Sequence, residues 1–258
     1  MAISDAGMEI RPLSGGVEYA ACVALQREIW GDTFAEVVPA TVLMIAQRMG
    51  GIATGAFDPS GELLGFVFGI SGVEGGTPAH WSDMLAVRPA ARRQGIGRRL
   101  KWHQREQLLA LGIDRMFWTY DPLVAANAHL NVERLGARPT RYVEHMYGDT
   151  GSRLHQGLAT DRLIMEWKLR APHVEALAAG ELPGTPVDRD PGPSLTQVDL
   201  PADIERLRQS APDEAVRWQQ QLRRTLGAPL NEGTVELVSV RRTSDGRWFY
   251  LLRSRGTR

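Results

Sequence analysis

The chain has 258 residues, of which 43% are hydrophobic and 23% charged, as in an ordinary folded protein with a packed core. Its 30 basic and 30 acidic residues give a formal net charge of zero, which argues against nucleic-acid or membrane binding driven by overall charge. No segment reaches the roughly 20 apolar residues of a membrane span, and the start MAISDAGMEIRPL lacks the pattern of a signal peptide. The single cysteine, Cys22, excludes an internal disulfide. We therefore expect a cytoplasmic protein, with Cys22 in the core of a helix rather than acting as a nucleophile.

The predicted elements alternate between strands and helices over the first 169 residues. Residues 8–13 are extended, and apolar spacing predicts helices over 16–30 and 39–51. Residues 52–70 predict two strands joined by the turn DPSG, and a further strand covers 80–87 before Pro89. A helix over 97–111, a strand over 113–120, a helix over 123–136 and two strands over 140–147 and 158–169 complete the region.

The composition changes after Leu169. Residues 170–200 are rich in proline and glycine without periodicity, which predicts a linker or wrapping arm. Residues 201–258 predict two helices and a hairpin that turns at SDG, an extension too small for a deep core of its own and a plausible dimer element. We therefore divide the chain into 1–169, 170–200 and 201–258.

A helix start rich in glycine and arginine follows the strand over 80–87. The segment RRQGIGRRL begins at Arg92, and seven basic residues but no acidic residue lie between Met84 and Arg105. The first turn of a helix has N–H groups without intrahelical partners, and glycine lets an anion approach the backbone closely. Each hydrogen bond from such an N–H group to a charged acceptor contributes about 1.5 to 3 kcal/mol, more than the helix dipole adds. This pattern favours a bound phosphate group.

The common nucleotide-binding and nucleic-acid-binding patterns fit the segment less well. Leu100 replaces the third small residue of a dinucleotide-binding fingerprint, and no P-loop spacing occurs. A nucleic-acid surface needs several stacking aromatic residues, whereas the segment is followed only by Trp102. A solvated basic helix start remains the structural alternative.

The segment Arg92-Arg93-Gln94-Gly95-Ile96-Gly97 resembles the acyl-CoA signature of the GCN5-related N-acetyltransferase (GNAT) superfamily. The order of predicted elements over residues 8–169 is similar as well. The resemblance implies a mixed α/β (α+β) fold, with a mostly antiparallel central sheet, helices on both faces and splayed central strands. The C-terminal helix–hairpin region is an addition to it, as in longer, uncharacterised members of the superfamily.

The resemblance also implies which residues bind acetyl-CoA, with no metal ion. Backbone amides of the glycine segment would hold the pyrophosphate, the strand before it would pair with the pantetheine arm, and an amide near Met84 and Leu85 would polarise the thioester carbonyl. Asn127 is a candidate for contact with the arm, or else a cap of its helix. The candidate CoA-binding residues are Leu85, Ala86, Val87, Arg92, Arg93, Gln94, Gly95, Ile96, Gly97, Arg98 and Asn127.

The chemistry requires a neutral attacking amine, a stabilised oxyanion and a proton for the leaving thiolate. Many members carry a proton-donating tyrosine where this chain has Val132. His80, Asp83 and Tyr120 are the candidate catalytic residues, with Glu28 and His145 as further bases and Tyr120 as a replacement hydroxyl. Each has a structural alternative in packing, capping or pairing. Other residues are expected to line an acceptor pocket or to grip an acceptor carboxylate: Tyr142, His145, Tyr147, Asp161 and Arg162.

These observations predict an acyl-CoA-dependent N-acyltransferase that acts on a small amine or amino acid by direct attack in a ternary complex. A succinyl-CoA enzyme with Arg141 or Arg162 as carboxylate partner is an alternative. A second alternative, suggested by Val132, is a CoA-binding sensor or scaffold without catalysis.

Overall fold

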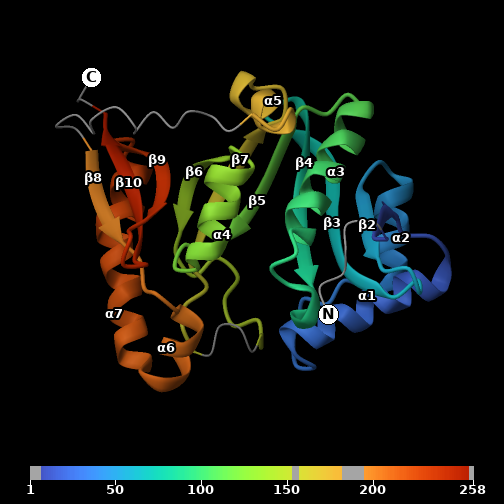
Figure 1. Cartoon of the computed structure of the whole chain (residues 1–258), viewed down its shortest axis with the longest axis horizontal. Coiled ribbons are helices and arrows are strands. Elements are labelled where there is room, and N and C mark those ends of the chain that lie inside the picture. The colour runs from blue at the N-terminus through green and yellow to red at the C-terminus, as the bar shows by residue number, and fades with distance from the viewer. Residues whose placement is uncertain (1–6, 153–156, 182–194, 256–258) are drawn as a thin grey trace. The chain divides into compact units, whose positions relative to one another are not determined.

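The computed structural model describes residues 7–152, 157–181 and 195–255 (Figure 1). The chain forms two compact units, one of Met1–Trp118 with Thr150–Arg153 and one of Thr119–Asp149 with Leu154–Arg258. This division follows contacts within the folded chain and differs from the three sequence segments, whose boundaries stay a prediction.

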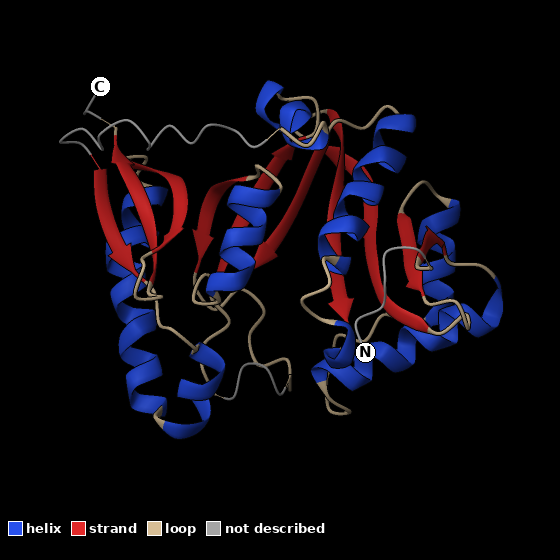
Figure 2. Cartoon of the chain, viewed as in Figure 1, coloured by secondary structure: helices blue, strands red, loops and turns tan. Residues whose placement is uncertain are grey.

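The first unit contains five strands and three α-helices among its described residues (Figure 2). The elements are β1 (Glu9–Pro12), α1 (Gly15–Trp30), α2 (Ala40–Arg48), β2 (Ile52–Phe57), β3 (Leu63–Glu74), β4 (Thr77–Val87), a 3-10 turn (Pro89–Ala91), α3 (Ile96–Ala110) and β5 (Arg115–Tyr120), whose last two residues belong to the second unit. The strands follow the order β1-β2-β3-β4-β5. Neighbours are antiparallel except β4 and β5, which are parallel.

Helices cover the centre of this sheet. All residues of β2 and the first seven of β3 are buried, as expected of strands covered on both faces. Helix α3 packs on β2, β3 and β4, while α1 and α2 pack on β3. The predicted hairpin is confirmed, and the Asp58 carboxylate stabilises its turn by accepting hydrogen bonds from the backbone N–H groups of Ser60 and Glu62, both 2.9 Å long.

The second unit combines a strand pair, a separate sheet and short helices. The elements are α4 (Ala125–His129) with a π-helical turn (Leu130–Arg134), β6 (Arg138–Val143), β7 (Arg162–Lys168), α5 (Pro172–Ala178), β8 (Leu195–Asp199), α6 (Ile204–Ser210), α7 (Pro212–Leu222) with a π-helical turn (Arg223–Gly227), α8 (Ala228–Asn231), β9 (Val235–Arg242) and β10 (Trp248–Ser254). Strands β6 and β7 are antiparallel. Strands β8, β10 and β9 form an antiparallel sheet in that order.

The C-terminal region is more regular than the sequence indicates. Its hairpin, β9 and β10, gains β8 as a third strand, and Tyr250 and Leu252 of β10 are buried. Both α5 and β8 lie within residues 170–200, where the sequence shows no periodicity. Residues 182–194 of that predicted linker lie outside the described residues. The fold class is confirmed: a mixed, mostly antiparallel sheet with helices and a C-terminal extension.

Neither unit has a described helix that is both long enough and apolar enough to cross a membrane. The described residues also contain no group of three side chains suited to hold a metal ion.

Cys22 is fully buried on α1, in agreement with a role in the core. Burial raises the pKa of its thiol to about 12, although a contact with Gln26 opposes the shift. Because the thiolate is the reactive form, we expect iodoacetamide at pH 8 to leave the folded chain unmodified and to label it in denaturant. Mass spectrometry of the intact protein checks this, and rapid labelling of the native chain would show that α1 opens.

Candidate functional site

Strand β4 parts from β5 after two paired residues. His80 and Trp81 pair with Met116 and Phe117, and no further pairing between the two strands occurs in the described part of the chain. Asp83, two residues after Trp81, is a bulge, the extra residue at the register shift between β3 and β4. We call this place, where the ladder stops, the β4–β5 fork. It is the predicted splay of the central strands.

The glycine segment forms a tight loop between β4 and α3. After the turn of Pro89–Ala91, Arg93 and Gly95 both adopt left-handed backbone conformations, with φ of 66° and 75°. Helix α3 then begins at Ile96. Within the described residues, the backbone N–H groups of Arg93 to Arg98 make no hydrogen bond. When left-handed residues precede the first turn of a helix, the N–H groups of this segment face one concave surface. Such a surface suits an anion.

Gly97 lies where the start of α3 packs on β4. A Cβ atom added at Gly97 would lie 3.7 Å from Leu85 and 3.9 Å from Val87, which is ordinary van der Waals contact. The chain itself therefore does not require glycine at this position. A glycine at a position where the protein has room for a larger side chain is consistent with a ligand that approaches the backbone closely.

The arginines of the segment surround this loop. Arg92 and Arg93 are exposed, and Arg92 donates a hydrogen bond to the carbonyl of Val87. Arg98 has a buried Nε that no hydrogen-bond acceptor reaches among the described residues. The loop thus combines unpaired backbone donors with positive side chains.

His80, predicted as a candidate base, is fully buried on β4. Its Nδ1 lies 3.0 Å from Ser71 Oγ and its Nε2 lies 3.0 Å from Gln104 Nε2, so both ring nitrogens have partners. Burial lowers the pKa of His80 to about 3, and nearby Lys101 contributes to the shift. The imidazole is therefore neutral at physiological pH, in a packed environment rather than facing a solvent-accessible acceptor.

The neutral His80 makes stability depend on pH. Between about pH 3 and the ordinary histidine pKa of about 6.5, the unfolded chain binds a proton that the folded chain does not, so stability falls as the pH falls. We expect the wild type to lose about 2 kcal/mol more than His80→Gln between pH 7 and pH 5. Urea unfolding at the two pH values checks this, and equal losses would mean that His80 is not buried neutral.

Asp83 and Glu28, two further candidate bases, differ in their surroundings. Asp83 is exposed at the bulge, and its pKa is raised because surrounding protein displaces water and because the Glu36 carboxylate is near. A carboxylate with a raised pKa suits proton abstraction. The Glu28 carboxylate pairs instead with Arg88 at 2.5 Å. Glu28 is thus held in an ion pair, whereas Asp83 is exposed.

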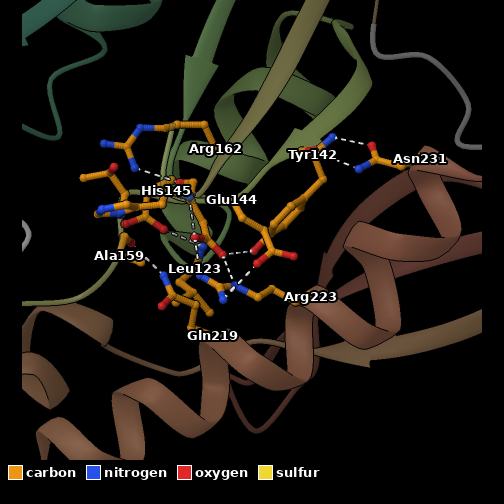
Figure 3. A network of polar contacts seen from close by, with 12 residues as sticks. Leu123, Tyr142, Glu144, His145, Ala159, Arg162, Gln219, Arg223 and Asn231 are labelled. Carbon is orange, nitrogen blue, oxygen red and sulfur yellow. Dashed lines mark hydrogen bonds and ion pairs between the residues drawn. The ribbon is translucent and has the colours of Figure 1, made fainter. Parts of the chain in front are cut away.

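A polar network of the second unit includes Tyr142, His145 and Arg223 (Figure 3), all of which donate hydrogen bonds to Asp161. The buried carboxylate of Asp161 accepts two hydrogen bonds of 2.7 Å from Arg223 and one of 2.7 Å from the Tyr142 hydroxyl. The backbone N–H group of His145 also donates to it, over 3.1 Å. Burial and the adjacent Asp161 raise the pKa of Tyr142. Asp161 is therefore fully engaged within this unit.

Other predicted residues of the second unit also have partners there. Tyr120 is buried with its hydroxyl 3.2 Å from that of Tyr250, which donates to the carbonyl of Pro122 over 2.7 Å. The Tyr120 hydroxyl therefore donates its hydrogen bond to Tyr250. To protonate the leaving thiolate, Tyr120 would first have to break this bond. The Tyr147 hydroxyl lies 2.9 Å from Thr119 Oγ1, and its ring faces the Arg162 guanidinium at 5.3 Å.

The remaining predicted residues of this unit differ in exposure. Asn127 is exposed on α4, whereas Val132 is buried in the π-helical turn that follows. Arg141 is exposed on β6. Arg162 is buried and donates a hydrogen bond of 2.7 Å to the carbonyl of Asp161.

Two residues have prominent positions that the sequence did not reveal. Arg223 pairs with an aspartate 62 residues away, which no local pattern signals. In the sequence Lys101 is only one member of the basic segment, yet it is buried on the face of α3 that carries Ile96, Leu100 and Leu108. The position of Lys101 at helical spacing among apolar residues was the one feature of the sequence that could have predicted its burial.

The first unit thus combines a mixed sheet, a bulged strand that diverges from its neighbour, and a glycine-rich helix start. The sequence profile of the acetyltransferase (GNAT) family matches residues 22–136. Over these residues the chain matches that family, and the C-terminal region extends beyond the match. A comparison with curated protein sequences finds no match.

Solved structures of similar fold are distant in sequence. One is the NatC complex bound to Gag peptide and CoA, with 16% identity and a TM-score of 0.51, covering 63% of this chain and 99% of that chain. Another is Arabidopsis thaliana Naa50 with a bisubstrate analogue, with 12% identity and a TM-score of 0.50, covering 62% of this chain and 97% of that chain. At these identities the likeness concerns the fold alone.

Proposed function

We propose that the protein is an acyl-CoA-dependent N-acyltransferase whose simplest donor is acetyl-CoA and whose acceptor is a small amine or amino acid. The observation that carries the proposal is the set of unpaired N–H groups from Arg93 to Arg98, at a helix start next to a diverging strand. The family match over residues 22–136 supports it. These N–H groups would bind the pyrophosphate of CoA, with Arg92 and Arg98 adding positive charge.

The rest of the donor would follow β4 toward the fork. Beyond the bulge, Leu85, Ala86 and Val87 pair with β3 on one side and have no β5 partner among the described residues. The amide groups of the pantetheine arm can pair with this free strand edge as a neighbouring strand would. Asn127 of α4 stays a candidate from the sequence alone. The thioester would then reach the Met84–Leu85 level, where a backbone N–H group stabilises the oxyanion.

The reaction needs a base on the acceptor side. Asp83 fits this role because its carboxylate is exposed at the bulge and its pKa is raised toward that of a useful base. The neutral amine would attack the thioester carbon directly, since the buried, protonated Cys22 offers no acyl-enzyme step. Asp83→Asn should therefore lower turnover far more than donor affinity.

The experiment is a panel of acyl-CoA thioesters offered with mixtures of amines and amino acids, with release of free thiol as the readout. We expect acetyl-CoA to support amine-dependent release in the wild type. Preference for succinyl-CoA would favour the carboxylate-binding alternative. CoA binding without turnover toward any amine would favour the sensor alternative over the enzyme.

A further inference from the structure

Strand β3 of the first unit continues beyond the end of its neighbour β2. The pairing between the two strands ends at Ile52 and Gly69, whereas β3 runs on to Glu74. Over residues 70–74, β4 pairs with β3 on one side, and no strand among the described residues pairs with it on the other side. We call residues 70–74 the open β3 edge. An unpaired strand edge presents N–H and C=O groups that can pair with another chain.

The turn after β3 determines which backbone groups face the open side. Strands β3 and β4 are joined by Gly75–Gly76, with φ of 58° and 81°, as in a type I′ hairpin turn. The residues that flank such a turn, Glu74 and Thr77, form a hydrogen-bonded pair. Because bonded and non-bonded pairs alternate along an antiparallel ladder, Ser71 and Val73 direct their N–H and C=O groups away from β4.

Pro78 supports this assignment independently. It lies opposite Val73 in the register of β3 and β4 and has no N–H group, so a non-bonded pair is expected there. The backbone groups of Ser71 and Val73 also form no hydrogen bond in a turn or loop of the described chain. The open β3 edge therefore presents the N–H and C=O groups of these two residues.

Apolar side chains are exposed on and beside this edge. Ile70 and Val73 are 50% and 75% exposed. The end of α2 lies next to them, because Ser71 Oγ donates to the carbonyl of Gly50 over 2.6 Å, and Met49, directly before Gly50, is 76% exposed. The sequence of the edge, ISGVE, contains neither the lysine nor the proline that commonly protects an edge from pairing. Such an edge promotes association unless another chain covers it.

Helix α2 provides further apolar surface. Val42, Ile45 and Met49 recur at helical spacing, so they share one face, and all three are exposed. A specific dimer buries roughly 1,200–2,000 Å² in total, which is more than a short strand edge supplies. Because α2 packs against β3, its exposed apolar face can extend a contact that begins at the strand.

We propose that two copies of this chain pair through their open β3 edges, antiparallel, to form one continuous sheet across a two-fold axis. The inference goes beyond the proposed function and does not depend on acyl-CoA. The occupant is a second copy because the edge is complementary to itself: Ser71 of each copy pairs with Val73 of the other. Each of these pairs exchanges two hydrogen bonds between backbone groups.

Gly72 lies at the two-fold axis of this pairing. It faces the Gly72 of the second copy in a non-bonded pair, whose Cα atoms are about 4.5 Å apart in antiparallel sheets. A Cβ atom added at Gly72 meets nothing within 4 Å, so no group of the chain itself obstructs the axis. The two Val73 side chains are diagonal neighbours on one face of the sheet, roughly 7–8 Å apart, and cover part of each other.

The charges at the ends of the pairing are complementary. The partner's Glu74 lies opposite Ile70 in this register, next to the end of α2. Arg48 at that end is exposed and has no ion-pair partner among the described residues. The Glu74 carboxylate lies 3.1 Å from Arg115 of its own chain, yet its side chain stays 60% exposed and can meet a second cation. The two-fold axis repeats this contact at the other end.

Sedimentation velocity over a series of concentrations tests the dimer. We expect the wild type to sediment as a dimer that dissociates on dilution. Val73→Lys places two like charges across the axis and should raise the dissociation constant at least about tenfold. Val17→Lys is the matched control, because it adds the same charge at an exposed valine of α1 and should sediment as the wild type does. Both variants should keep the circular dichroism of the wild type.

Disulfide formation tests the register. Gly72→Cys places two thiols across the axis at a Cα separation that a disulfide can span, so mild oxidation should link two chains. Gly16→Cys is the matched control, because φ is not positive there and a Cβ also meets nothing within 4 Å. The native Cys22 is fully buried and should not react. A non-reducing gel measures the linked fraction, which should be high only for Gly72→Cys.

Each outcome supports or overturns the proposal. A wild-type chain that stays monomeric at every concentration overturns it. A dimer that persists in Val73→Lys uses another surface, such as the C-terminal hairpin, and overturns it as well. Should Val73→Lys misfold, the disulfide test decides alone, and equal linking of Gly72→Cys and Gly16→Cys is then the contrary result. None of these measurements involves acetyl-CoA, so failure of the proposed function would leave the dimer unaffected.

Discussion

Gly97→Asp is expected to weaken acetyl-CoA binding by more than about 100-fold and to leave the fold intact. The new carboxylate would stand against the proposed pyrophosphate and deny it two or more amide hydrogen bonds of about 1.5 to 3 kcal/mol each, where about 1.4 kcal/mol is tenfold in affinity. The fold should survive because a Cβ at this position meets only ordinary contacts with Leu85 and Val87, and aspartate is favourable in a first helical turn. Calorimetric titration and circular dichroism measure the two effects.

Gly16→Asp is the matched control for this variant. It adds the same charge near the start of α1, where a Cβ meets nothing within 4 Å and φ is not positive. It should bind acetyl-CoA as the wild type does. Unchanged affinity in a folded Gly97→Asp chain would contradict the phosphate site.

Arg223→Met is expected to destabilise the second unit by about 3 kcal/mol. The substitution leaves the Asp161 carboxylate, whose side chain is 2% exposed, with a negative charge and no cation bound to it. The Tyr142 hydroxyl and one backbone N–H group would still donate to it, and the partial exposure of Arg223 lets some water enter. Chemical unfolding followed by tryptophan fluorescence measures the loss.

The neighbouring Arg224 supplies the comparison, because its side chain is exposed and forms no ion pair within the described residues. Arg224→Met should change stability by less than about 0.5 kcal/mol. The double variant Arg223→Met with Asp161→Asn should recover part of the loss, since it removes the uncompensated buried charge. Equal stability of the two single variants would mean that the Asp161 pair is not formed in solution.

The parts of the fold that local chemistry determines were predictable. The DPSG turn needs only the Asp58 carboxylate and its neighbours, and the start of α3 follows from a strand, two glycines and helical spacing. Strand β8 was not predictable, because its residues become a strand only by pairing with β10, some 50 positions further on. Non-local pairing leaves no period in the sequence of the shorter partner.

The residues of the candidate site also differ in how far the sequence alone predicts their positions. The glycine segment is continuous in sequence, so its residues can be recognised together. The positions of His80 and Tyr120 depend on what packs over them, and residue type alone gave no sign that Gln104 and Tyr250 hold them. Asp83 acquires its distinct environment from a bulge, a register shift that depends on β3. Tertiary contacts thus decide which titratable groups are available for chemistry.

The proposed function depends above all on the backbone N–H groups at the start of α3, which would hold the diphosphate of an acyl-CoA. Isothermal titration of the whole chain with acetyl-CoA, repeated in the presence of adenosine 3′,5′-diphosphate, tests this most directly. We expect saturable binding of one acetyl-CoA per chain, weakened competitively by the diphosphate. Absence of saturable binding to the folded chain would contradict the acyl-CoA site.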